Sequence, residues 1–141
     1  MIKNISVETI QFIAHTLAKK TMDWQEPIPP FETRYPNILE SCVKVPFQRF
    51  DKKSLYPGLI AKAAMLFYLM NKNHPFQNGN KRVAITALLV FLSLNDKWLE
   101  ADKTELYNFS LWVAQSPAEA KEETVKYIEK FIKKRMVKFL R

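Results

Sequence analysis

The segment from His74 to Arg82, which reads His-Pro-Phe-Gln-Asn-Gly-Asn-Lys-Arg, combines residue types that suit phosphate chemistry. The imidazole of His74 is suited to accept a proton near neutral pH. Gly79 lacks a Cβ atom, so a phosphate can approach the main chain there. Lys81 adds a point charge, and Arg82 adds a planar fork that binds phosphate oxygens in pairs. The segment therefore predicts a base beside an anion-binding site.

Two helical patterns flank this segment and must position it. Residues 57–73 begin with a proline suited to a first helical turn and then carry an apolar face. Residues 80–94 are apolar on nearly every side, which is typical of a buried central helix. The start of that helix leaves backbone amides unpaired and carries partial positive charge. We therefore expect Gly79, Asn80 and Lys81 to form an anion-binding nest.

Further helices are indicated by caps and by apolar periodicity. Their expected starts are Ser6, Asn37, Asp102 followed by Glu105, and Ser116 followed by Glu119. The first of these helices is expected to carry an apolar stripe made of Val7, Ile10, Ile13, Ala14 and Leu17. His15 lies one residue beyond that stripe, and we assign it no role.

Two segments interrupt the helices. Residues 26–36 contain four prolines and predict an extended connection. Residues 43–50 partly alternate apolar with polar side chains, and Pro46 favours an edge position, so we expect an edge strand or flap. The sequence as a whole predicts an all-α fold, a helical bundle around a buried central helix with a short β-hairpin flap. We expect residues 1–141 to form a single domain without repeats.

Composition limits the class of protein and its surroundings. The chain has 141 residues, 48% of them hydrophobic, and no run of apolar residues near the roughly 20 that span a bilayer. Its start lacks the pattern of a secretory signal. Cys42 is the one cysteine, which favours a buried thiol over a disulfide or a metal ligand. We therefore expect a cytoplasmic protein with no membrane contact.

The formal net charge of +8 is compatible with nucleic acid, nucleotide phosphates or an acidic protein as partners, and charge alone does not choose among them. Much of this charge lies within residues 130–141, where cations also favour the end of a helix.

The order of residues in the segment resembles the signature of the Fic family, His-x-Phe-x-Asp/Glu-Gly-Asn-Gly-Arg-x-x-Arg. It is more similar to the Doc branch, in which lysine replaces the third glycine and the last arginine is lost. The matching residues are His74, Phe76, Gly79, Asn80, Lys81 and Arg82, and Ile85 stands where the second arginine would be. The resemblance covers residues 38–99 well.

This resemblance implies transfer of part of a nucleotide triphosphate, such as ATP, to a hydroxyl of a target protein. His74 would be the general base and Phe76 the anchor of the loop. Gly79, Asn80 and Arg82 would hold phosphates, with Lys81 supplying extra charge. In Doc-like proteins the transferred group is the terminal phosphate and the target a translation factor, whereas Fic proteins proper transfer AMP. Lys81 and Ile85 favour the Doc outcome.

The family's flap aligns the target by adding a strand. By the same resemblance, Val45, Phe47 and Gln48 would form this docking flap here.

One residue departs from the family pattern. The acidic position that holds Mg²⁺ in the family is Asn78 here, whose amide oxygen brings no negative charge. Two interpretations stay open. Either nucleotide phosphates hold most of the Mg²⁺ with help from Asn78, or the chain is a weakened or noncatalytic relative that binds nucleotide or nucleic acid. We favour the enzyme, for which nucleic acid is not an expected partner.

Many family members carry an inhibitory motif, Ser/Thr-x-x-x-Glu-Gly/Asn, and no serine or threonine of this chain fits it. The resemblance therefore implies control by a separate antitoxin chain, as in bacterial toxin and antitoxin pairs. Phe109, Trp112, Tyr127 and the basic tail are candidates for its docking surface, although core packing is the commoner role of such aromatic residues.

Overall fold

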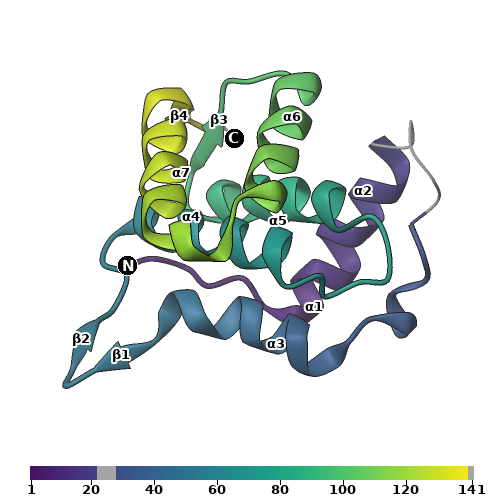
Figure 1. Ribbon diagram of the computed structural model, residues 1–141, viewed down its shortest axis with the longest axis horizontal. Coiled ribbons are helices and arrows are strands. Elements are labelled where there is room, and N and C mark those ends of the chain that lie inside the picture. Colours follow the sequence, from purple (N-terminus) through teal and green to yellow (C-terminus); the bar gives the residue numbers. More distant parts are fainter. Residues whose placement is uncertain (22–27, 140–141) are drawn as a thin grey trace.

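The computed structural model describes residues 1–21 and 28–139. Glu26 and Pro27 of the expected extended connection, and Arg141 of the basic tail, lie outside these residues. Within the described part the chain is helical apart from two short antiparallel strand pairs, as the all-α prediction requires (Figure 1). None of its helices is long and apolar enough to cross a bilayer.

The central helix is confirmed. Helix α5, Asn80–Leu94, is buried along most of its length and packs against α4, Leu59–Lys72, and α6, Lys103–Gln115. Its apolar residues form the middle of the core because neighbouring helices cover it on several sides. Figure 1 shows α5 crossing the middle of the molecule.

Helix α4 begins slightly later than the sequence suggests. Gly58 occupies the cap position with a φ of +87°, so Pro57 lies before the helix and not in its first turn. The helix ends at Lys72 with Asn73 as its C-cap, close to the expected end.

The first helix begins at Ser6, whose Oγ accepts a hydrogen bond from the amide of Thr9, and this confirms the predicted cap. It continues through α1 (Val7–Thr9), a π-helical segment η1 (Ile10–His15) and α2 (Thr16–Thr21).

The predicted apolar stripe is wrong in part, because π-helical bonds join residues five apart and rotate the following side chains. Ile13 and Leu17 are 42% and 40% exposed, whereas Ala18 and His15 are buried. The sequence placed His15 at the edge of the stripe, and that placement is also wrong.

The expected strand over residues 43–50 is largely wrong. Helix α3, Pro36–Lys44, continues into a 3₁₀ turn, η3 (Val45–Phe47), in which Pro46 is the second residue. The hairpin itself exists further along, where β1 (Arg49–Phe50) pairs with β2 (Lys53–Ser54). Its two-residue turn has positive φ at both positions, the geometry whose twist matches that of the strands.

The C-terminal half combines one confirmed cap with one that does not form. Asp102 accepts a hydrogen bond from the amide of Glu105 at the start of α6, as predicted. Ser116 instead donates to the carbonyl of Val113, so the second capping box is wrong. A 3₁₀ turn, η4 (Ala118–Ala120), leads into α7 (Lys121–Arg135).

The basic tail is not helical throughout, since α7 ends at Arg135. Strand β4 (Met136–Lys138) then pairs antiparallel with β3 (Lys97–Leu99), with Trp98 opposite Val137. This strand pair fastens the end of the described chain beside the C-terminal end of α5.

Candidate active site

The loop between α4 and α5 carries the predicted motif, and its first residue is exposed. His74 has a φ of +50°, a conformation that few residues other than glycine adopt, and its side chain lies at the surface. Such backbone outliers occur preferentially at functional sites. Pro75 and Phe76 follow and are buried, so they hold the loop against the core while the imidazole of His74 remains accessible to solvent.

Phe76, for which the sequence predicts the role of loop anchor, is buried and is joined to Asn80 by two hydrogen bonds. The amide of Phe76 donates to Oδ1 of Asn80, and Nδ2 of Asn80 donates to the carbonyl of Phe76, both at 2.9 Å. This pair of bonds closes the loop over one turn and occupies both ends of a buried amide side chain. The Asn80 side chain therefore helps to shape the loop by bonding to both polar groups of the Phe76 main chain.

Gly79 forms the cap of α5 in a left-handed conformation, with φ +76° and ψ +16°. A Cβ atom added here would lie 2.8 Å from Cγ1 of Ile28 and 3.4 Å from a terminal guanidinium nitrogen of Arg82. The position thus requires glycine for two reasons: its left-handed backbone conformation, and the lack of room for a Cβ atom beside Ile28. Arg82, only 3% exposed, brings its guanidinium close to this helix start.

Lys81 is half-buried in the first turn of α5, so two cationic residues, Lys81 and Arg82, follow the positive start of the helix. This is the arrangement expected of an anion site, with the exposed His74 at the other end of the same loop. An exposed imidazole and the positive start of a helix thus lie at the two ends of one loop.

The residues present do not make a metal site of their own. Oδ1 of Asn78, the position of the family's acidic ligand, accepts a hydrogen bond from the amide of Gly79 at 2.8 Å. In the part of the chain that the structure describes, no group of three His, Cys, Asp or Glu side chains could hold a metal ion. A neutral amide engaged in this way is a weak ligand for a hard cation such as Mg²⁺.

The hairpin projects from the helices as an independent arm (Figure 1). Nζ of Lys62, on α4, fixes its base by donating to Oγ of Ser54 at 2.9 Å and to the carbonyl of Tyr56 at 2.5 Å. Burial, together with the nearby Arg49, lowers the pKa of the Lys62 amine. At the tip, Phe50 is 74% exposed.

The residues predicted for the docking flap lie before this arm and not on its strands. The ring of Phe47 packs edge-on against that of Phe91 on α5, with 5.6 Å between centroids, and Val45 is half-buried. Gln48 is exposed and its carbonyl accepts a hydrogen bond from the amide of Leu55. Docking through side chains of Val45 or Phe47 would thus disturb the core.

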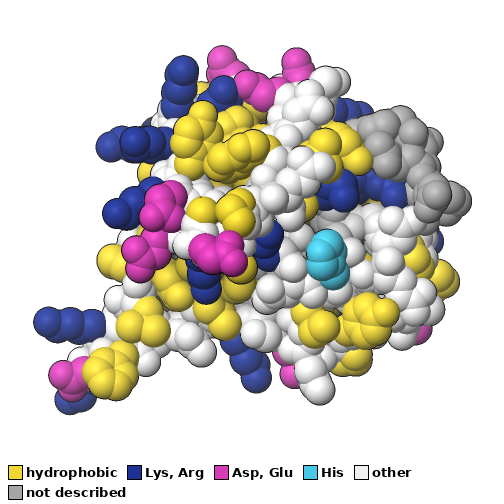
Figure 2. Space-filling view, in the orientation of Figure 1, with side chains coloured by type: hydrophobic (Ala, Val, Ile, Leu, Met, Phe, Trp, Pro, Cys, Tyr) yellow, Lys and Arg dark blue, Asp and Glu magenta, His cyan; other side chains and the backbone are white. Residues whose placement is uncertain are grey.

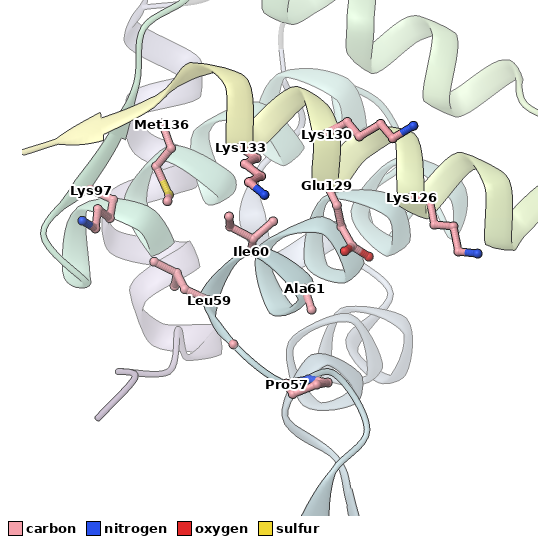
Figure 3. A pocket seen from close by; sticks show the side chains of 11 residues that line it. Pro57, Leu59, Ile60, Ala61, Lys97, Lys126, Glu129, Lys130, Lys133 and Met136 are labelled. Carbon is pink, nitrogen blue, oxygen red and sulfur yellow. The ribbon is translucent and has the colours of Figure 1, made fainter.

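A cavity of about 620 Å³ lies between the start of α4 and α7, far from the loop (Figure 3). Helix α4 has 14 residues, so its two ends are separated by roughly 20 Å. Figure 3 shows Lys133 reaching from α7 toward Ile60, with Leu59 and Met136 beside it. The cavity is lined by four lysines, by Glu129 and by aliphatic residues, and it shares none of its lining residues with the loop.

Cations gather on the side of the molecule that carries this cavity, over α7 (Figure 2).

Of the aromatic residues considered for docking, Phe109 is half-buried and stacks on Phe131 with 3.9 Å between ring centroids. Trp112 and Tyr127 are exposed and in contact with each other. Core packing thus accounts for Phe109. Trp112 and Tyr127 remain candidates for an exposed docking surface.

Three residues that contact the loop were missed or left without a role by the sequence: His15, Ile28 and Tyr35. Ile28 covers Gly79, and the amide of Tyr35 donates to the carbonyl of Pro75 at 2.9 Å. The one sequence signal was an isolated isoleucine among prolines, which does not reveal its partner.

Comparison with known proteins identifies the family of the chain. The model of the Fic/DOC family matches residues 4–92, which include the whole loop. Over 65 residues the chain is 37% identical to Toxin Doc of Mycolicibacterium smegmatis, an alignment covering 46% of this chain and 50% of that protein. The chain thus spans about half the length of this curated relative. No solved structure matches significantly. Because the family model covers more than half of the sequence and the loop carries its motif, the chain belongs to the Fic/DOC family.

Proposed function

We propose that this protein is a Doc-like toxin that transfers the γ-phosphate of ATP to a Ser or Thr hydroxyl of a target protein. The observation that carries the proposal is the joint placement of an exposed His74 and the cationic start of α5 on one anchored loop. The similarity to Toxin Doc supports the toxin part of the proposal.

In the proposed reaction, the imidazole of His74 removes the proton of the target hydroxyl. The hydroxyl oxygen forms a bond to the γ-phosphorus, the bond from that phosphorus to the bridging oxygen breaks, and ADP leaves. Phosphoryl transfer depends mostly on positioning and on stabilisation of phosphate charge. Backbone amides at the start of α5, with Lys81 and Arg82, would supply both.

The phosphate that moves distinguishes the proposal from AMP transfer. Incubating the protein with a bacterial extract and ATP labelled at the γ position is expected to label a target, whereas ATP labelled at the α position is not. Lys81 and Ile85 favour this outcome. Transfer of the α label would replace the proposal by AMP transfer. Absence of both labels would favour a noncatalytic binding relative.

The amide at position 78 should affect how much Mg²⁺ the transfer reaction needs. We expect Asn78→Asp to lower the Mg²⁺ concentration needed for half-maximal transfer by about tenfold, because a carboxylate adds charge for a hard cation and still accepts from the Gly79 amide. Asn78→Ala, which removes the oxygen, is the matched control and is expected to raise that concentration. An unchanged Mg²⁺ dependence in both variants would exclude Asn78 from the metal's surroundings.

The hairpin gives a prediction about the target. A target segment could add to the edge of the arm by backbone pairing, and the arm must be held for this to work. Lys62→Met keeps the length of the side chain but loses both hydrogen bonds to the hairpin base. We expect the KM for the target protein to rise several-fold while the KM for ATP is unchanged.

The control for this prediction is Lys53→Met, which removes a charge from the exposed hairpin without touching its base. An equal effect of the two variants on target KM would assign the change to charge and would remove the support for a held arm.

We also propose that a separate antitoxin controls the protein, since the chain lacks the inhibitory motif of other family members. Expression of the chain alone is expected to arrest bacterial growth, and co-expression of a small protein encoded by a neighbouring reading frame should relieve the arrest. Normal growth on expression of soluble, folded protein would contradict the toxin assignment.

A further inference from the structure

His15 packs against the back of the motif loop, although it lies about 60 residues away in sequence. Its side chain is only 4% exposed. The ring lies 5.5 Å from that of Phe76, the loop anchor, and 5.4 Å from that of Phe31, in an edge-on arrangement with the latter. Phe31 and Phe76 are themselves 5.9 Å apart, so the three rings form one closed cluster beneath the loop.

A hydrogen bond adds direction to this packing. Nε2 of His15 lies 3.1 Å from the carbonyl oxygen of Pro29, and because a carbonyl can only accept, Nε2 carries the proton. Pro29 belongs to residues 28–35, which we name the strap. His15 is thus joined to the strap by a hydrogen bond and to the loop by ring contact.

The strap touches the loop at two further points. At one end Ile28 covers Gly79, the cap of α5, and at the other the amide of Tyr35 donates to the carbonyl of Pro75. The strap therefore spans the loop from the residue after the base to the start of the anion nest. A shift of the strap would therefore change its contacts with both Gly79 and Pro75.

The first helix turns His15 toward this cluster through its π-helical segment. Such segments are rare and often occur at functional sites. A phenylalanine here could fill the space but not donate to Pro29, and a glutamine could donate but not complete the ring cluster. Histidine supplies both contacts.

We propose that His15 is a positioning residue that sets the geometry of the motif loop by holding the strap against it. This inference deepens the proposed function, on which it rests, because the loop it positions is the proposed phosphate site. His15 itself is buried beneath the loop, so we assign it no contact with nucleotide or target. It acts through Phe76 and through the strap.

Two variants separate its ring from its hydrogen bond. His15→Phe keeps the ring and loses the donor, whereas His15→Gln keeps a donor near the position of Nε2. In His15→Phe we expect amide hydrogen exchange at Tyr35, which reports strap contact with Pro75, to become about tenfold faster. In His15→Gln exchange should stay closer to that of the native protein. Exchange in the middle of α5 should be unchanged in both.

Protonation gives a second readout. Burial is the main cause that lowers the pKa of His15, with Lys19 adding to this and the Pro29 hydrogen bond and Glu32 opposing it. Lys20 also lines the cavity beside the ring. The neutral form is therefore favoured in the folded state, and stability from His15 is complete above the ordinary pKa of about 6.5 and is lost as pH falls through the lower folded value.

Protection of the Tyr35 amide, corrected for intrinsic exchange, should accordingly decline below pH about 6.5 in the native protein. In His15→Phe, which has no imidazole at this position, protection of the Tyr35 amide should not show this decline. Equal acceleration of exchange at Tyr35 and throughout α5 would mean ordinary loss of stability and would overturn the proposal, as would unchanged Tyr35 exchange in His15→Phe. These readouts need no transfer activity, so their outcome is independent of whether phosphate transfer itself is observed.

Discussion

Replacing His74 with asparagine is expected to lower the single-turnover rate of phosphate transfer by about 10²–10⁴-fold, the usual contribution of a general base. The imidazole is exposed, so little packing is lost. Asparagine tolerates the positive φ of this position, whereas alanine there adds backbone strain. His74→Asn therefore removes the base with the least disturbance of the loop, and its melting temperature should stay near that of the native protein.

The matched control is Gln77→Ala, which truncates another exposed side chain of the same loop. Its transfer rate should stay within a few-fold of the native rate, with native ATP binding. A His74→Asn protein that keeps more than about a tenth of the native rate would remove His74 from the role of base.

Replacing Gly79 with alanine is expected to damage both stability and nucleotide binding. The positive φ costs an L-residue about 1–2 kcal/mol. The new methyl group would also meet Ile28 at 2.8 Å and crowd the guanidinium of Arg82. We expect the affinity for ATP, measured by calorimetry, to fall by at least tenfold.

The chain provides a control for this change in its second glycine. Gly58 caps α4 with a φ of +87° and a ψ of +163°, a conformation that is essentially restricted to glycine, but a Cβ atom there would have nothing within 4 Å. Gly58→Ala should therefore show the backbone cost alone and bind ATP normally. Because Ile28 is itself buried, Ile28→Ala alone should also destabilise the protein, but the loss in the double variant Gly79→Ala with Ile28→Ala should be smaller than the sum of the two single losses. Equal ATP affinity in the two alanine variants would contradict a phosphate site at the start of α5.

Features set by short-range chemistry were predictable from sequence. The caps at Ser6 and Asp102 depend on a side chain and an amide three residues away, and both form as expected. The central helix was predictable because residues 80–94 are apolar on almost every face, which leaves burial as the one stable arrangement.

Features that depend on tertiary partners were not predictable. Alternation over residues 43–50 suggested a strand, but Val43 and Phe47 are needed in the core, and a helix followed by a 3₁₀ turn buries them. The inward turn of His15 follows from a π-helical segment that no local pattern indicated. For the same reason, the two hydrogen bonds between the side chain of Asn80 and the main chain of Phe76 were not predictable from the sequence.

We expect the phosphates of ATP to bind at the loop from His74 to Arg82. Titration of ¹⁵N-labelled protein with ATP tests it most directly, because each amide signal reports its own surroundings. We expect saturable shifts at Gly79, Asn80 and Lys81, with smaller changes elsewhere. Shifts confined to the lysine-lined cavity around Ile60 and Lys133, with none at the start of α5, would contradict the claim.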